Sequence, residues 1–253
     1  MSASMAGFIH LRLHTEYSLI DGTIRLERPD PIQDDPKQRH KEERFKTLAE
    51  RAAELGLPAV AVTDLNNLFG MVKFYKSAES NGVKPLIGAD LTLEERKAGE
   101  GAELVTFLVQ NEQGYRNLVK LVSLAYTHGQ QSGAPRVKRE WIAGACGGLI
   151  VLCGPRSTIG LQLLGGHFDA AAAELAQWRG WFGDRLYLEI HRCGRPDDEP
   201  HLRAAVKLAK RSGVPVVATN DVRFLRRQDF DAHEARICIA QGWTLDNDRR
   251  PKL

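Results

Sequence analysis

The sequence predicts an α/β protein, more specifically a distorted (β/α)7 barrel. Short apolar runs rich in β-branched residues alternate along the chain with amphipathic stretches of helical spacing. Alternation of this kind is typical of parallel βαβ units. No glycine-rich loop follows any of the runs, which disfavours an open nucleotide-binding sheet. The 253 residues, 43% of them hydrophobic, are enough for one large core of this class.

Seven runs are the candidate strands, and in chain order they lie near residues 8–14, 59–63, 84–93, 104–109, 149–153, 186–191 and 215–219. The first run differs from the rest because it alternates between polar and apolar residues. His10, Arg12 and His14 therefore share one face of the predicted strand. A polar, ionisable face suits a barrel whose interior opens on a site, and in such barrels the chemistry lies at the carboxyl ends of the strands.

The predicted helices lie near residues 45–55, 68–78, 118–125, 168–182, 198–212 and 228–241. The first is followed by Gly56 and Pro58, which are common just beyond a helix C-terminus. The second has an apolar stripe formed by Leu68, Val72, Tyr75 and Ala78. Residues 27–41 are rich in proline and charge, so they predict a flexible inserted loop that cannot bury enough apolar surface to order itself.

Composition excludes several classes of protein. The 35 basic and 32 acidic residues give a net charge of +3, which makes no independent case for nucleic-acid or membrane binding. No apolar run approaches the ~20 residues that span a bilayer, and the N-terminal residues do not read as a signal peptide. The 4 cysteines lack CxxC spacing, which predicts reduced thiols. We therefore expect a cytoplasmic protein with no membrane partner.

Six segments together resemble one known family. They are HLRLHTEYSLIDG (10–22), AVTDLNNLFGMVKFYKSA (61–78), KPLIGADLTL (84–93), LVQNEQGYRNL (108–118), LYLEIHRCGRPDDE (186–199) and VVATNDVRFLRRQDFDAHEA (216–235). In this order they are similar to the PHP (polymerase and histidinol phosphatase) domain at the N-terminus of bacterial DNA polymerase III α subunits. The resemblance implies a distorted (β/α)7 barrel. It also implies that residues 1–253 form one PHP domain, the N-terminal fragment of a larger DNA-directed DNA polymerase.

Metal-binding members of that family carry histidine-rich ligands at the strand ends, and the bound divalent ions activate water against a phosphoester. The resemblance implies that this chain has lost most of those ligands. Positions where the family places ligands are occupied here by Arg12, Leu65, Leu104, Pro155, Cys193 and Arg223. The acidic and histidine residues that remain at or beside the family's site are His10, His14, Asp21, Asp64, Asp90 and Asp221.

This residue set predicts a degenerate metal site with no catalytic residue. Leucine donates nothing to a metal, and arginine adds fixed positive charge where an ion would lie. We expect no cofactor in this chain, and if an ion binds at all, it binds to His14, Asp21, Asp90 and Asp221. The hypothesis for the site is that Arg12 and Arg223 replace the lost ions by pairing with the remaining carboxylates.

Several residues have a plainer alternative. His10 and His14 would be buried core histidines, Asp21 before Gly22 would shape a turn, and Asp221 would cap the following segment. The arginines at 223, 226 and 227 form a local basic patch that is either a solvated surface or a phosphate site.

The resemblance implies a structural role for the domain, packed against the rest of the polymerase α subunit and docking the proofreading exonuclease subunit. Through the parent protein it implies DNA, the sliding clamp and the clamp loader as partners, and Mg²⁺ in a separate polymerase site. The alternatives are a residual metal-dependent phosphoesterase, pyrophosphatase or 3′–5′ exonuclease, and a stand-alone relative of histidinol phosphatase.

Overall fold

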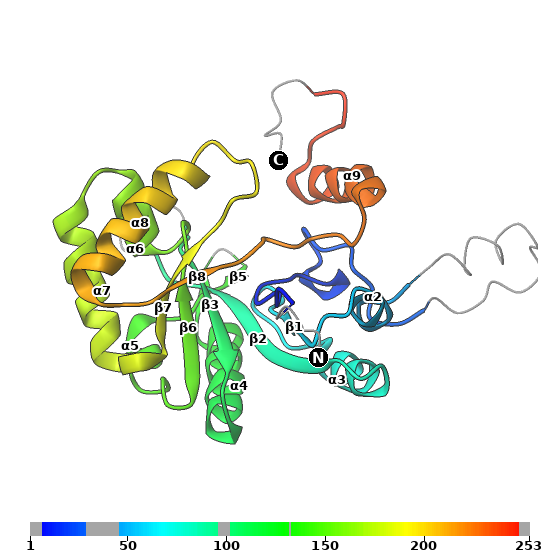
Figure 1. Ribbon diagram of the computed structural model, residues 1–253, viewed down its shortest axis with the longest axis horizontal. Helices are drawn as coiled ribbons and strands as arrows, with labels where there is room; N and C mark the ends of the chain where they lie inside the picture. The colour runs from blue at the N-terminus through cyan, green and yellow to red at the C-terminus, as the bar shows by residue number, and fades with distance from the viewer. Residues whose placement is uncertain (1–6, 29–45, 96–101, 132, 248–253) are drawn as a thin grey trace, which may run out of the picture. The chain divides into compact units, whose positions relative to one another are not determined.

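The computed structural model describes residues 7–28, 46–95, 102–131 and 133–247 (Figure 1). The chain divides into two compact units. Unit 1 comprises Met1–Val62, Phe69–Leu86 and Val222–Leu253, and unit 2 comprises Thr63–Leu68 and Ile87–Asp221. From residue 29 onward, the predicted inserted loop at 27–41 lies outside the described residues.

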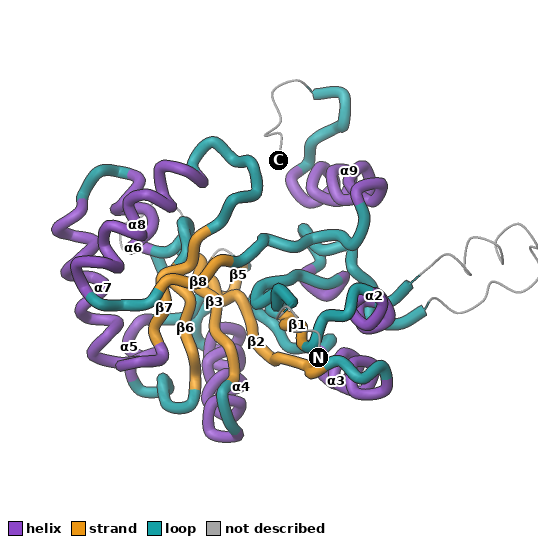
Figure 2. The backbone as a smooth tube through the Cα atoms, viewed as in Figure 1, coloured by secondary structure: helices purple, strands orange, loops and turns teal. Residues whose placement is uncertain are grey.

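Unit 2 is built on a sheet whose strands follow the order β2-β3-β6-β7-β8 (Figure 2). They are β2 (Lys84–Thr92, which begins in unit 1), β3 (Leu104–Val109), β6 (Leu149–Cys153), β7 (Leu186–Ile190) and β8 (Val216–Ala218). The last three strands are parallel, as predicted. β2 and β3 pair antiparallel, and so do β3 and β6, which corrects the expectation of βαβ units throughout. Residues 93–103 are too few for a parallel crossover, which usually needs a dozen residues or more.

The helices of unit 2 cover one face of this sheet. They are α4 (Glu112–Thr127), α5 (Arg139–Ala143), α6 (Thr158–Leu164), α7 (Phe168–Phe182), which is followed by η2 (Gly183–Arg185), and α8 (Asp198–Ser212). Phe107 of β3 and Leu188 of β7 point to this face, where they join Leu121 of α4 and Trp178 of α7 in the core. Because side chains alternate along a strand, Asp90, Thr106 and Glu189 point to the other face. A short hairpin of β4 (Gln130–Gln131) and β5 (Ala134–Pro135) completes the unit.

Unit 1 contains β1 (Ala59–Val62), α2 (Leu48–Glu54), α3 (Met71–Ser80), α9 (Phe230–Gln241) and the single turns η1 (Glu16–Ser18) and η3 (Arg227–Asp229). Helix α2 begins at a capping box, in which Thr47 and Glu50 each satisfy the other's backbone N–H. Helix α3 buries Phe74 and Ala78. The predicted stripe is therefore only partly right, because Val72 and Tyr75 are exposed.

The N-terminal segment occupies the position of a strand without forming a continuous one. Isolated parallel bridges join His10 to Val60 of β1 and Leu13 to Val222. The backbone N–H of His14 donates to the carbonyl of Val222 at 3.0 Å. The other six predicted strands are confirmed, as are all six predicted helices. Among the described helices, none combines the length and the apolar character that crossing a membrane requires.

Candidate functional site

In unit 1 three of the predicted site residues, His14, Asp21 and Arg223, form an ion-paired group. Arg12, His14 and Arg223 are buried, with exposed fractions of 3%, 1% and 6%. The two carboxylate oxygens of Asp21 are both engaged: Oδ1 lies 2.8 Å from His14 Nδ1, and Oδ2 accepts a hydrogen bond from Arg223 Nη1 at 2.7 Å. The predicted pairing of Arg223 with a surviving carboxylate is thus present, and it is Asp21 that it engages.

A tight turn presents Asp21 to these partners. A Cβ at Gly22 would lie 1.9 Å from the carbonyl oxygen of Thr15, so only glycine fits at that position. Directly after it, the backbone N–H and the hydroxyl of Thr23 both donate to the Arg223 carbonyl at 3.0 Å. Asp21 therefore lies in a turn whose close approach is permitted by Gly22, and its own side chain carries the ion pair.

In unit 2 a second group surrounds Asp90, which is fully buried together with Asp64. The Thr106 hydroxyl donates to Asp90 Oδ1 at 2.5 Å, across the β2–β3 pair in which the two residues face each other. Leu65 is bridged to Asp90, and Leu104 faces Thr92 two residues farther along β2. Both leucines thus lie beside a buried carboxylate, where they contribute no donor.

Asp221 lies in unit 2 and pairs with a residue that the sequence did not single out. Arg195 Nη2 donates to Asp221 Oδ2 at 2.8 Å. The expectation that Asp221 caps the next segment is wrong, because the next helical turn begins only at Arg227. Cys193 is exposed, and its backbone N–H donates to Asp198 at 2.6 Å. All four cysteines are free thiols in the structure.

Sequence reasoning missed a buried group at the carboxyl end of β7. Glu189 Oε1 accepts a hydrogen bond from the Thr219 hydroxyl at 2.6 Å and lies 3.2 Å from His191 Nε2. On helix α8, burial lowers the pKa of His201 to about 4, and the neighbouring His191 adds to the effect. The available signal was the period of two that places Glu189 and His191 on one face of an otherwise apolar strand.

These groups do not fit the polynuclear metal centre of the metal-binding PHP domains. Within the described residues, no three His, Cys, Asp or Glu side chains converge as a metal site would require. Both oxygens of Asp21 are already engaged, and Arg223 places positive charge beside them. A cluster of dications needs several deprotonated donors to offset the repulsion between the ions, and Leu65 and Leu104 supply none.

Comparison with known proteins supports the same family. The family model described as "PHP domain" matches residues 38–193. The chain belongs to the PHP domain family. It is 45% identical over 98% of its length to the DNA polymerase III subunit alpha of Pseudomonas fluorescens, and 42% identical over 97% to that of Escherichia coli K12. The chain spans about a fifth of the length of these relatives, 20% in both cases.

One solved structure supports the fold alone. An amidohydrolase from Chromobacterium violaceum superposes with a TM-score of 0.51 at 14% identity, covering 91% of this chain and 97% of that one. Together with the family match, this confirms the predicted fold class, an α/β barrel of the PHP type.

Proposed function

We propose that this chain is the PHP domain of a replicative DNA polymerase III α subunit. The parent protein would carry out template-directed DNA synthesis in the cytoplasm, with Mg²⁺ at a polymerase site outside these residues. Its partners would be DNA, the sliding clamp and the clamp loader. The observation that supports this is the similarity to polymerase subunits over 98% of the chain, well beyond the boundaries of the family match.

Within that protein, we propose that the domain is structural and catalytically inactive. The engagement of both Asp21 oxygens supports this most strongly, because a carboxylate that is already neutralised by Arg223 is a poor ligand for a second cation. The leucines beside Asp90 act in the same direction, since they leave a buried carboxylate without the neutral donors that a metal site would add.

We further propose that the domain docks the proofreading exonuclease subunit and packs against the rest of the polymerase. An apolar strip at helix α3 supports an interaction surface of this kind. Val72 and Tyr75 are 55% and 46% exposed, and their spacing of three residues places them on one side of the helix. Phe69, which is 62% exposed, lies just before the N-cap Gly70. Large apolar side chains that gather at the surface are typical of protein–protein contacts.

Inactivity is tested by hydrolysis assays on the purified chain with added Mn²⁺ or Zn²⁺. The substrates are a small phosphomonoester, pyrophosphate and single-stranded DNA labelled at its 3′ end. We expect no turnover above the metal-only blank. Metal-dependent turnover that disappears in His14→Ala would favour the residual phosphoesterase instead.

Docking is tested by titrating the exonuclease subunit against this chain. Val72→Asp places a charge in the apolar strip and should weaken binding by about tenfold or more. Val119→Asp is the matched control, because Val119 lies on α4 and is 38% exposed. Equal affinities of the two variants for the exonuclease would exclude α3 as the docking surface. Absence of binding between the unmodified chain and the exonuclease would refute the docking role.

A further inference from the structure

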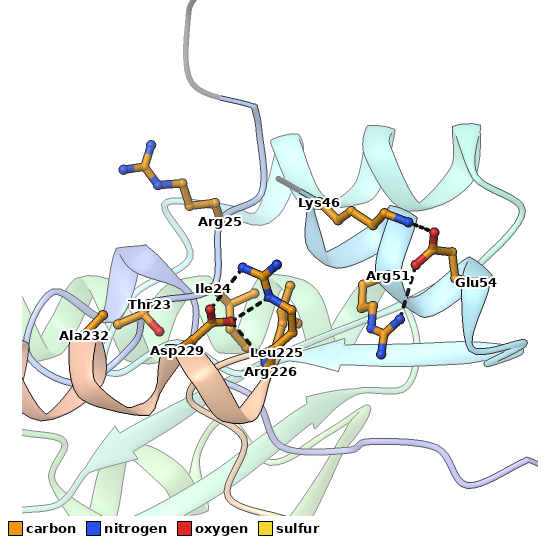
Figure 3. Close-up of a pocket in the computed structure, with 10 residues that line it drawn as sticks. All are labelled: Thr23, Ile24, Arg25, Lys46, Arg51, Glu54, Leu225, Arg226, Asp229 and Ala232. Carbon is orange, nitrogen blue, oxygen red and sulfur yellow. Dashed lines mark hydrogen bonds and ion pairs between the residues drawn. The ribbon is translucent and has the colours of Figure 1, made fainter. Parts of the chain in front are cut away.

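We propose that a pocket in unit 1 binds a phosphate group that carries two negative charges. The pocket lies between helix α2, the segment 23–25 and the start of α9, and has a volume of about 280 Å³ (Figure 3). Its lining includes none of the positions at which the PHP family carries metal ligands. It is therefore separate from the degenerate site, and the inference does not depend on the proposed function.

The pocket has an excess of positive charge. Two carboxylates line it, Glu54 and Asp229, against four cationic side chains, which are Arg25, Lys46, Arg51 and Arg226. These come from segments that are far apart in the sequence, as Figure 3 shows. Four positive and two negative side chains line one cavity, and Arg25 also pairs at 3.8 Å with Glu16, outside the lining. The excess that a ligand meets is therefore between +1 and +2. Such a lining disfavours a metal ion and favours an anion.

The two carboxylates hold the cationic groups in place. Glu54 forms ion pairs with both Lys46 and Arg51, and the distance from its Oε2 to Arg51 Nη1 is 3.3 Å. Asp229 binds Arg226 through two guanidinium nitrogens, at 3.0 and 3.3 Å. Because each carboxylate is paired with cations of the pocket, the cationic side chains are held in position before a ligand binds.

Arg51 carries the most specific signal. Its Nε is buried and has no hydrogen-bond acceptor among the described residues. A buried donor without an acceptor is costly, and an oxygen of a bound anion is the kind of group that removes the cost. The guanidinium fork also matches the geometry of phosphate oxygens, and three of the four cations in the pocket are arginines.

The lining disfavours a ligand that needs base stacking, and the volume disfavours a large one. Ile24, which is 1% exposed, gives part of the pocket an apolar wall, and no aromatic ring among the described residues lines it for a base to stack on. The volume of about 280 Å³ is below the ~300–1,000 Å³ of drug-sized ligand sites.

The net charge of the pocket favours a phosphomonoester over a phosphodiester. A phosphomonoester carries about −1.5 to −2 at pH 7 and is attracted more strongly by this excess than an internal phosphodiester, which carries a single charge. The ligand is therefore inorganic phosphate, or the terminal phosphate of a nucleotide or of a nucleic-acid end.

The test is calorimetric titration of the full chain at low ionic strength. The probes are inorganic phosphate, a nucleoside monophosphate, and a short oligonucleotide with and without a 5′-phosphate. We expect saturable binding of inorganic phosphate that weakens as salt is added. If only the phosphorylated oligonucleotide binds more tightly than inorganic phosphate, the natural ligand is the end of a nucleic-acid strand. Equal affinities for inorganic phosphate and the mononucleotide identify a small metabolite instead.

Variants make the site specific. Arg51→Gln should weaken phosphate binding by about tenfold, and Arg226→Gln should do the same. The matched control is Arg227→Gln, an exposed neighbour that does not line the pocket. Thermal unfolding of each variant checks that it folds. If Arg51→Gln does not fold, the affinity of Arg226→Gln for phosphate decides the test.

Three outcomes overturn the proposal. The first is no saturable binding of any phosphate probe up to about 10 mM, a Kd weaker than specific recognition requires. The second is an equal loss of affinity in Arg227→Gln and in the pocket variants. The third is a glutamate-rich peptide that binds through these arginines when no phosphate does.

Discussion

The two units hold their carboxylates in different ways. In unit 1, the side chain of Asp21 is 21% exposed and is neutralised by the full charge of Arg223 together with His14. In unit 2, Asp90 and Glu189 are 0% and 1% exposed, and each accepts a short hydrogen bond from a threonine hydroxyl. Asp21 is thus matched by a buried arginine, whereas Asp90 and Glu189 each accept from a threonine hydroxyl, and Glu189 also lies 3.2 Å from His191. Unit 2 has an arginine-paired group as well, in which Arg139 binds the buried Glu103 and Glu174.

We predict that no single substitution gives either unit a metal site. Unit 1 contains added positive charge, which repels an ion. In unit 2, Leu65 and Leu104 lie beside Asp90 and supply no donor to an ion.

The largest effect is expected where one cation serves two buried carboxylates. Arg139 lies in unit 2 and binds both Glu103 and Glu174 at 2.5 Å. Arg139→Met should lower the free energy of unfolding by about 3–5 kcal/mol, because it removes the one cation that pairs with both of these buried carboxylates. Urea denaturation measures the loss.

Arg116→Met is the control for that substitution. Arg116 pairs with Glu112 on α4 at the surface, with exposed fractions of 70% and 76%. Such a pair should contribute no more than about 0.5 kcal/mol. Similar losses of stability in the two variants would show that burial does not determine how much an ion pair contributes to the stability of this protein.

Acidification should destabilise unit 2 through His201. The pKa of this buried histidine is about 4 in the folded chain, whereas an unfolded histidine titrates near 6.5. As the pH falls from about 6.5 to 4, the unfolded state takes up the proton before the folded state does, so stability is lost over that window, by on the order of 2–3 kcal/mol. Denaturation curves at a series of pH values measure the effect. His201→Gln should flatten the curve in this window, and an unchanged slope would contradict the assignment to His201.

Removing a hydroxyl from the deep group should cost less. Thr106→Val is close to isosteric and deletes the donor to Asp90, so we expect a loss of about 2 kcal/mol. The control is Thr127→Val on α4, where the exposed hydroxyl donates to the Ser123 carbonyl and lies 2.7 Å from His128 Nδ1. Chemical denaturation of both variants should show a clear loss for the first and little change for the second.

The smallest effect is expected in unit 1. Arg223→Met removes the ion pair with Asp21, but that carboxylate keeps His14 and partial contact with solvent. We expect a loss of about 1–2 kcal/mol, smaller than that of Arg139→Met. If Arg223→Met proves the more damaging substitution, the contrast between the two units is reversed.

Local patterns predicted most of this fold. The six confirmed strands and six confirmed helices follow from periodicity and from turn residues such as Gly56, which are properties of neighbouring residues. The pairing direction of β2 and β3 was not predicted because it depends on the length of the connection between them, which the periodicity of each strand does not indicate. Helices α5 and α6 have 5 and 7 residues, too few for a helical period to stand out.

The candidate site was predicted less completely, for a physical reason. The resemblance located Asp21, Asp90 and Arg223, but a partner that is distant in sequence leaves no local signal. Arg195 and Asp221 are 26 residues apart, and the lining of the basic pocket extends from Thr23 to Ala232. The sequence did show the basic patch around Arg226, and it left open whether that patch is a phosphate site.

The most direct test of the central claim is a count of bound metal. The purified chain is dialysed against Zn²⁺ or Mn²⁺ and analysed for its metal content, alongside Arg12→His. We predict fewer than one ion per chain in both proteins, and lower stability with no gain of metal in Arg12→His. Two or more ions per chain that are lost in His14→Ala would contradict the account.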